Sequence, residues 1–301
     1  MNLKQNILIQ LRAMKTLLNC PSIIHDPPHV LEDIIHGHPM PPKHFRHEID
    51  FDGIAWITFD SPKSSVNVWN EETLREFNHL LETIEHDTRV KAVVLRSAKE
   101  RIFIAGADIK AIRSMQHVRV NDLIWLGQAV FDRLARLKVP KIAAIHGACM
   151  GGGFELALGC HFRVATANAS IALPEIKLGL IPGAGGTQRL PRAIGKAKAM
   201  DMCLSARTLS AEEADRYGLV SRVVPTDALM SATLTLAQQM ASYSLPALMA
   251  IKESVNRAWE SSLSEGILFE RRALHARFAS ADAHEGMHAF LEKRPPAVSH
   301  R

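Results

Sequence analysis

The chain has 301 residues, of which 47% are apolar or aromatic, so it is long enough to bury a substantial core in one large domain or two smaller ones. Only 22% of the residues are charged, a proportion typical of folded globular proteins, which excludes a largely disordered chain. The formal net charge of +5 favours an anionic ligand or partner, but it is too small to require nucleic acid.

The first 47 residues differ from the rest, because they hold six of the fifteen prolines and six of the fifteen histidines. Residues 3–18 have the apolar spacing of an amphipathic helix. We therefore predict an N-terminal helix and a Pro/His-rich arm over residues 1–47, with a mitochondrial transit peptide as the alternative. The histidines match no metal-binding spacing, so we expect them to be solvated and predict no metal site.

From residue 49 onward, the spacing of apolar residues predicts alternating strands and helices. A strand over residues 54–59 follows a turn at Asp52 and Gly53, which joins it to a strand over 48–51 in a hairpin. A helix over 71–85 has four apolar residues on one face. Thr73 and Glu76 stand near its start at the spacing of a capping box.

The rest of the chain continues this alternation and then becomes helical. The expected strands cover residues 91–95, 141–146, 162–166, 170–173 and 219–224, and the expected helices cover 123–137 and 154–160. After Asp227 the pattern is helical through Phe290. The only long uncharged stretch, residues 228–251, is interrupted at Pro246, so we expect no membrane span. Together these elements predict an α/β domain with an α-helical C-terminal region.

Three segments carry residues suited to chemistry, namely 104–110 (Ile-Ala-Gly-Ala-Asp-Ile-Lys), 146–156 and 174–189. In the second, glycines 151–153 stand between a buried strand and a helix. There, backbone N–H groups can approach a ligand with the helix dipole behind them. This pattern suits an anion or oxyanion site. A tight strand–helix crossing that needs small residues is the alternative.

Two glutamates accompany these glycines. Glu155 lies in the first turn of an otherwise apolar helix, where a carboxylate is costly unless it has a task or a partner. Glu175 follows Pro174 and precedes a glycine-rich loop. Favourable interaction with the helix dipole and N-capping are the respective structural alternatives. Beside backbone donors, two such carboxylates can hold a water molecule and transfer a proton.

In their order and spacing, the three segments resemble the crotonase (enoyl-CoA hydratase/isomerase) superfamily from about residue 48 to residue 293. The resemblance implies a spiral core of ββα units over residues 48–227 and an α-helical C-terminal trimerisation region over 228–301. It also implies assembly as a homotrimer or a homohexamer. The arm over residues 1–47 has no counterpart in this resemblance.

The resemblance further implies the reaction and the residues that perform it. An oxyanion hole would be formed by the backbone N–H groups of Ala107 and Gly152. Glu155 would act as the base toward the attacking water, and Glu175 as the acid toward the α-carbon. The implied reaction is the reversible hydration of a trans-2-enoyl-CoA to a 3-hydroxyacyl-CoA. No cofactor is implied, because coenzyme A is part of the substrate.

Binding of the acyl-CoA thioester is implied for a larger set of positions. The candidates are the segment around the first motif, one loop lysine and two residues of the tail: Ala105, Asp108, Ile109, Lys110, Lys63, Phe290 and Lys293. Residues 114–122, expected as a variable loop, and the tail would determine the length of the acyl pocket.

Three further expectations concern rival functions and location. Isomerisation of the double bond, or other enolate chemistry, is the alternative reaction, although the presence of both glutamates favours hydration. Some superfamily relatives bind RNA, but the basic residues of this chain are scattered, so we expect no nucleic-acid partner. Four cysteines without zinc-like spacing suit a reducing compartment, so we predict a cytoplasmic protein, with the mitochondrial matrix as the alternative.

Overall fold

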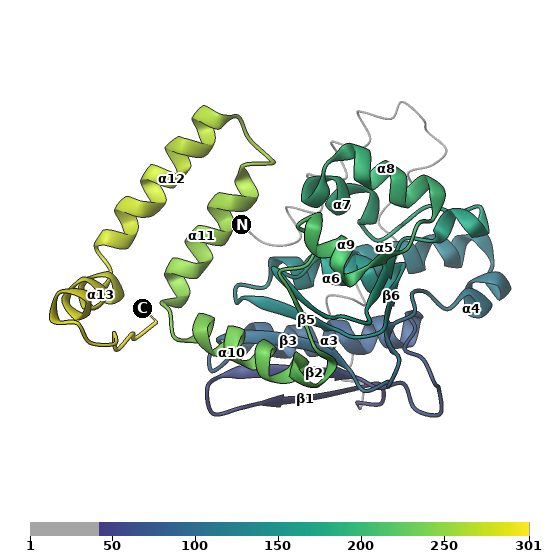
Figure 1. The fold of residues 1–301 in the computed structure, drawn as a ribbon, viewed down its shortest axis with the longest axis horizontal. Coiled ribbons are helices and arrows are strands. Elements are labelled where there is room, and N and C mark those ends of the chain that lie inside the picture. The colour runs from purple at the N-terminus through teal and green to yellow at the C-terminus, as the bar shows by residue number, and fades with distance from the viewer. Residues whose placement is uncertain (1–41, 301) are drawn as a thin grey trace. The chain divides into compact units, whose positions relative to one another are not determined.

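The computed structural model describes residues 42–300 (Figure 1). Most of the predicted N-terminal arm, residues 1–41, therefore lies outside the described residues. The first strand already begins at Phe45, whose side chain is only 4% exposed. None of the helices within residues 42–300 is long and apolar enough to cross a membrane.

A six-stranded sheet forms the centre of the fold, with the strand order β1-β2-β3-β5-β7-β10. Its strands are β1 (Phe45–Ile49), β2 (Ile54–Phe59), β3 (Ala92–Ser97), β5 (Lys141–Ile145), β7 (Phe162–Thr166) and β10 (Arg222–Val224). The β1–β2 hairpin is antiparallel and every other pair is parallel. The inner strands β2 and β5 are buried along their whole length, as expected for parallel strands covered on both faces.

A smaller, four-stranded sheet has the order β4-β6-β8-β9. Its strands are β4 (Ile102–Ile104), β6 (Ala148–Met150), β8 (Ser170–Ala172) and β9 (Leu209–Ser210). The chain alternates between the sheets, because β3, β5 and β7 join the large sheet while β4, β6 and β8, which follow them, join the small one. Helical segments follow each pair of strands, which confirms the predicted ββα arrangement and the α/β class.

Helices cover both faces of the large sheet. On one face, α10 (Leu229–Ala241) packs Leu236 and Met240 against a cluster that includes Trp56 and Val94 (Figure 1). The opposite face is covered by α3 (Glu71–His86) and α5 (His117–Arg136), which contact each other. Five aromatic rings in stacked, tilted or edge-on contact fill the space beneath them: Phe45, Phe59, Trp69, Phe77 and Phe131.

The remaining helices surround the small sheet or form the C-terminal region. They are α4 (Ile109–Ser114), α6 (Gly152–Leu158), η1 (Glu175–Leu178), α7 (Gly186–Ile194), α8 (Lys196–Ser205), α9 (Ala211–Arg216), η2 (Thr226–Ala228), α11 (Leu245–Arg257), α12 (Leu263–Phe278) and α13 (Ala281–Glu292). The predicted helical C-terminal region is confirmed. Its helices α11 and α12 have no fully buried residue, and they expose many large apolar side chains.

Several local predictions were wrong. The helix α3 is capped by Asn70, which exchanges hydrogen bonds with Thr73 in a capping box. Glu76 instead accepts the backbone N–H groups of residues 43–45 at 2.8–3.0 Å. His44, expected to be solvated, is consequently buried, with its Nδ1 atom 3.2 Å from the Ser61 hydroxyl.

Several predicted boundaries also differ from the structure. The first strand of the hairpin ends at Ile49, because the Asp50 carboxylate accepts the N–H groups of Asp52 and Ile54 and folds the turn there. The helix α5 begins at His117, so most of the expected loop over residues 114–122 is helical. The strand predicted over 219–224 is shorter and begins at Arg222.

Candidate active site

The glycines 151–153 join β6 to α6 and bring this junction close to the first motif. Gly151 has a φ of +51°, a left-handed conformation that glycine adopts without strain. Gly153 packs so closely on β4 that a Cβ atom there would lie 2.6 Å from the carbonyl oxygen of Ile104. This close packing places Gly152 beside Ala107: a Cβ atom on Gly152 would lie 3.9 Å from the Ala107 nitrogen.

The segment that contains Ala107 is held by its neighbours rather than by a regular sheet. The backbone N–H of Trp69 donates to the carbonyl of Gly106, and the backbone carbonyl of Trp69 accepts the N–H of Asp108, both at 2.8 Å. Asn67, which is fully buried, accepts the N–H of Ala105 with its backbone carbonyl, and its side-chain amide donates to Phe59 O at 2.9 Å. The sequence analysis did not identify Asn67 or Trp69, because a single polar or aromatic residue in a loop gives no periodic signal.

Two backbone N–H groups are left available at this junction. Residues 105, 106 and 108 each form a backbone hydrogen bond with Asn67 or Trp69. The N–H of Ala107, which lies among them, has no hydrogen-bond partner among the described residues. Gly152 is the first residue of α6, where a helix offers its N–H groups no internal acceptor. Since the two residues are adjacent in space, their amides can bind one anionic oxygen.

Glu155 lies one helical turn after Gly151 and is 3% exposed. Its Oε1 atom accepts the backbone N–H groups of Ala184 and Gly186, each at 2.8 Å. Its Oε2 atom faces the junction, 4.0 Å from the Cβ position of Gly152. Burial raises the pKa of Glu155, whereas the two amides and the charge of Arg189 lower it.

Glu175 is the first residue of η1 and lies on the other side of the junction. Its Oε1 atom is 2.9 Å from the Cβ position of Gly151, and its buried Oε2 atom has no hydrogen-bond partner within the described chain. Burial raises the pKa of Glu175 to about 7, and the negative charge of Glu155 acts in the same direction. A carboxyl group with such a pKa can donate or accept a proton near neutral pH.

The other predicted site residues lie at three places in the chain. Ala105, Asp108, Ile109 and Lys110 lie within or beside the Ala107 segment, where Asp108 caps α4 by accepting the N–H of Ala111 at 3.1 Å. Lys63 is exposed in the loop after β2. Phe290, which is 82% exposed, and Lys293 belong to the end of α13. These residues therefore lie on separate elements of the chain: the segment that leads into α4, the loop after β2 and the end of α13.

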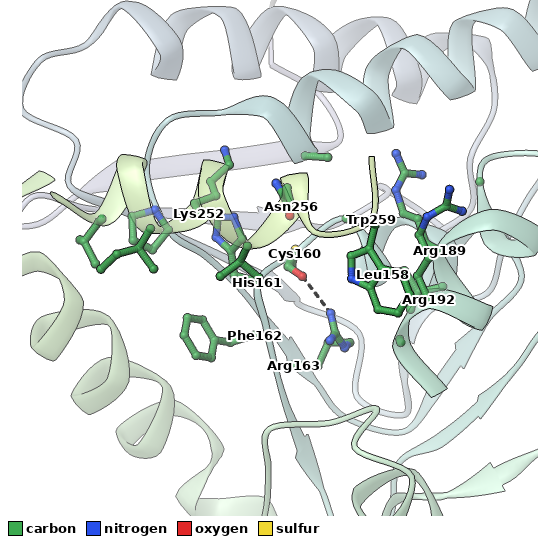
Figure 2. Close-up of a pocket in the computed structure, with 18 of the residues that line it drawn as sticks. Leu158, Cys160, His161, Phe162, Arg163, Arg189, Arg192, Lys252, Asn256 and Trp259 are labelled. Carbon is green, nitrogen blue, oxygen red and sulfur yellow. Dashed lines mark hydrogen bonds between the residues drawn. The ribbon is translucent and has the colours of Figure 1, made fainter. Parts of the chain in front are cut away.

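A separate cavity of about 1280 Å³ lies between α11 and the core (Figure 2). His161, Arg163, Lys252 and Trp259 line it, and neither glutamate does. Ala184 and Gly185 also line it, and the N–H of Ala184 donates to Glu155, so the cavity borders the loop that binds this glutamate. The predicted site is therefore the glycine junction and not this cavity.

Comparison with known proteins identifies the family. The enoyl-CoA hydratase/isomerase family model matches residues 50–301. A protein of Rhizobium meliloti named "Probable enoyl-CoA hydratase" is 45% identical over 248 residues, which cover 82% of this chain and 95% of that protein. The short-chain-enoyl-CoA hydratase of Clostridium acetobutylicum is 38% identical over 241 residues, covering 80% of this chain and 92% of that protein.

Solved structures agree with this result. The crystal structure of an enoyl-CoA hydratase from Bacillus anthracis matches with a TM-score of 0.83 and 34% identity, covering 86% of this chain and 100% of that one. Because the family model covers most of the chain, including the three segments that carry the resemblance to the crotonase superfamily, the chain belongs to the enoyl-CoA hydratase/isomerase family.

Proposed function

We propose that the protein catalyses the reversible hydration of trans-2-enoyl-CoA to 3-hydroxyacyl-CoA, in fatty-acid β-oxidation or a related degradation of acyl-CoA. One observation carries the proposal: two carboxyl groups, Glu155 and Glu175, flank a junction with two available backbone N–H groups. The family membership supports the same reaction class. The free thiols of Cys149, Cys160 and Cys203 suit the reducing cytoplasm, where we expect the enzyme to act.

The proposed mechanism uses the amides to stabilise charge and the glutamates to move protons. The N–H groups of Ala107 and Gly152 bind the thioester oxygen, whose negative charge grows as the substrate becomes enolate-like. Glu155 takes a proton from a water molecule, whose oxygen forms a bond to the β-carbon. The electron pair of the double bond moves toward the α-carbon, which takes the proton of Glu175. The two glutamates thereby exchange their protonation states.

The coenzyme A part of the substrate is proposed to bind along the Ala107 segment. The backbone of Ala105, Asp108, Ile109 and Lys110 would follow the pantetheine, and the partial exposure of this segment supports the proposal. Lys63 and Lys293 would bind the phosphates of coenzyme A, and Phe290 would pack near the acyl or adenine end of the substrate. No other cofactor takes part in this mechanism.

The direct test is an assay with crotonyl-CoA. We expect a rapid loss of the absorbance of the conjugated enoyl thioester, with 3-hydroxybutyryl-CoA identified as the product by mass spectrometry. A trans-3-enoyl-CoA supplied in parallel tests the alternative reaction. Conversion of the 3-enoyl substrate without hydration of 2-enoyl substrates of any chain length would replace the proposed hydratase by an isomerase.

The pKa of Glu175 predicts the pH dependence of hydration. The active enzyme holds one proton on the pair of glutamates, so kcat/KM falls above about pH 7 as this proton is lost, about tenfold per pH unit. It also falls at low pH, where both glutamates are protonated. The reverse reaction needs the same single proton, so steady-state kinetics from about pH 5 to 9 should give matching profiles in both directions. A profile that stays flat from about pH 6 to 9 contradicts this assignment.

The C-terminal helices support the proposed assembly as a trimer or a hexamer. Their exposed large apolar side chains are Ile251, Val255, Trp259, Leu263, Ile267, Leu274, Phe278, Met287, Phe290 and Leu291. So many exposed apolar residues on neighbouring helices are typical of an interface between chains. Size-exclusion chromatography with light scattering should give three or six times the chain mass of 33.3 kDa. A species with the mass of one chain contradicts the proposal.

A further inference from the structure

The loop over residues 183–186 holds Glu155 with its N–H groups and is itself held by its carbonyl groups. The carbonyl of Gly183 accepts a hydrogen bond from the Gln128 side chain at 2.7 Å. The carbonyl of Ala184 accepts one from Nη1 of Arg189 at 3.0 Å. The loop that orients Glu155 is thus fixed from its outer side by two side chains.

Arg189 is itself anchored. Its Nη2 atom donates to Oδ1 of Asp132 at 2.5 Å, and its backbone N–H donates to the carbonyl of Gly185 at 2.8 Å. The guanidinium lies so close to the loop that a Cβ atom on Gly185 would be 2.0 Å from Nη1. Gln128 and Asp132 are one turn apart on α5, so a single face of that helix supports the loop through both contacts.

The charges around Glu155 make this support electrostatic as well as geometric. Glu175 on η1 and Cys203 on α8 also interact electrostatically with Glu155, and a negative charge on either disfavours the ionised carboxylate. Burial acts in the same direction, whereas the Gly186 and Ala184 amides and the charge of Arg189 favour the ionised form. Arg189 therefore supplies the positive side chain that opposes these effects. Its guanidinium also holds the Ala184 carbonyl, which belongs to the peptide group between the two that donate to Glu155.

We propose that Arg189, anchored by Asp132 and assisted by Gln128, is a positioning residue that keeps the 183–186 loop aligned on Glu155 and so keeps this carboxylate ionised and correctly oriented. The inference rests on the proposed function in one respect, because it takes Glu155 to be the base of the hydration. The hydrogen bonds that carry it are independent of that assignment.

The kinetic test replaces Arg189 by glutamine and uses Arg192→Gln as the matched control. Arg192 lies on the same helix and lines the same cavity (Figure 2), and within the described chain its side chain donates only to the carbonyl of Gln188. For Arg189→Gln we expect kcat for crotonyl-CoA to fall about 10- to 100-fold with KM nearly unchanged, because a small displacement of a reacting group has effects of this size. The acid limb of the pH profile should move to higher pH, because the positive charge that lowers the pKa of Glu155 is lost. Arg189→Lys should recover part of kcat.

A second readout separates this inference from the proposed reaction. Infrared titration of the carboxyl groups, with the Glu155 signal assigned by its absence in Glu155→Gln, follows Glu155 without any substrate. We expect Glu155 to titrate at higher pH in Arg189→Gln than in the wild type or in Arg192→Gln. If the wild type does not hydrate enoyl-CoA but this shift is present, the proposed function fails and the positioning role stands.

Milder variants cover the case in which Arg189→Gln does not fold. Asp132→Asn and Gln128→Leu each remove one support while leaving the arginine in place, and each should shift the titration of Glu155 in the same direction by a smaller amount. Titration curves for folded Asp132→Asn and Arg189→Gln that coincide with that of Arg192→Gln would overturn the proposal.

Discussion

Replacing either glutamate by glutamine is expected to reduce kcat for the hydration of crotonyl-CoA about 10²- to 10⁴-fold, while KM changes little. Glutamine keeps the size of the side chain but can neither accept nor deliver the proton that the reaction moves. In Glu155→Gln, the amide oxygen can still accept the N–H groups of Ala184 and Gly186, so the loop should remain in place. The loss then reports the missing proton transfer rather than a displaced loop.

The double variant makes this prediction more specific. If Glu155 and Glu175 share one proton and act as a unit, removing both should cost about as much as removing either one. The matched control is Glu212→Gln, since Glu212 is an exposed first-turn acid of α9 and should leave kcat unchanged. Thermal unfolding of every variant checks that the fold is retained. Losses below about tenfold for both single variants would contradict the proposed roles.

The parts of the fold that could be predicted from the sequence are those in which side chains face a single kind of environment. The strand over residues 162–166 was predicted with its observed ends, and its last three residues are buried. Strands β4 and β6, with three residues each, are too short to show a period. The helix α7 was missed because Gly186 begins it and Pro191 lies inside it, and both residues are usual signs of a loop.

The site shows a similar division. Side chains with a chemical signature, Glu155 and Glu175, could be selected as candidates from the sequence together with the glycines. The groups that hold them in place could not. Ala184 and Gly186 contribute only backbone N–H groups, which every residue except proline possesses, and Asn67 acts from a loop 40 residues before Ala107. Such contacts depend on the three-dimensional path of the chain and leave no local pattern.

Replacing Gly152 by proline removes one proposed oxyanion donor without removing a side chain. Proline lacks the N–H group but is well accepted at the first position of a helix, which is where Gly152 stands in α6. If this N–H binds the thioester oxygen, kcat should fall about 10²- to 10³-fold, the loss typical of a deleted oxyanion donor. Stopped-flow hydration of crotonyl-CoA measures the effect.

Gly152→Ala is the matched control, because it adds a Cβ atom at the same place and keeps the N–H. That atom would lie 3.2 Å from Cδ1 of Trp69, so both variants share this tight contact and any small displacement that it causes. The ratio of their rates therefore measures the loss of the N–H group together with the effect of the proline Cδ atom that takes its place. Equal rates for the alanine and proline variants, with both proteins folded, would mean that the Gly152 amide does not stabilise the enolate-like oxygen. The backbone N–H of Ala107 alone would then stabilise the negative charge on the thioester oxygen, and replacing Gly152 would affect only packing.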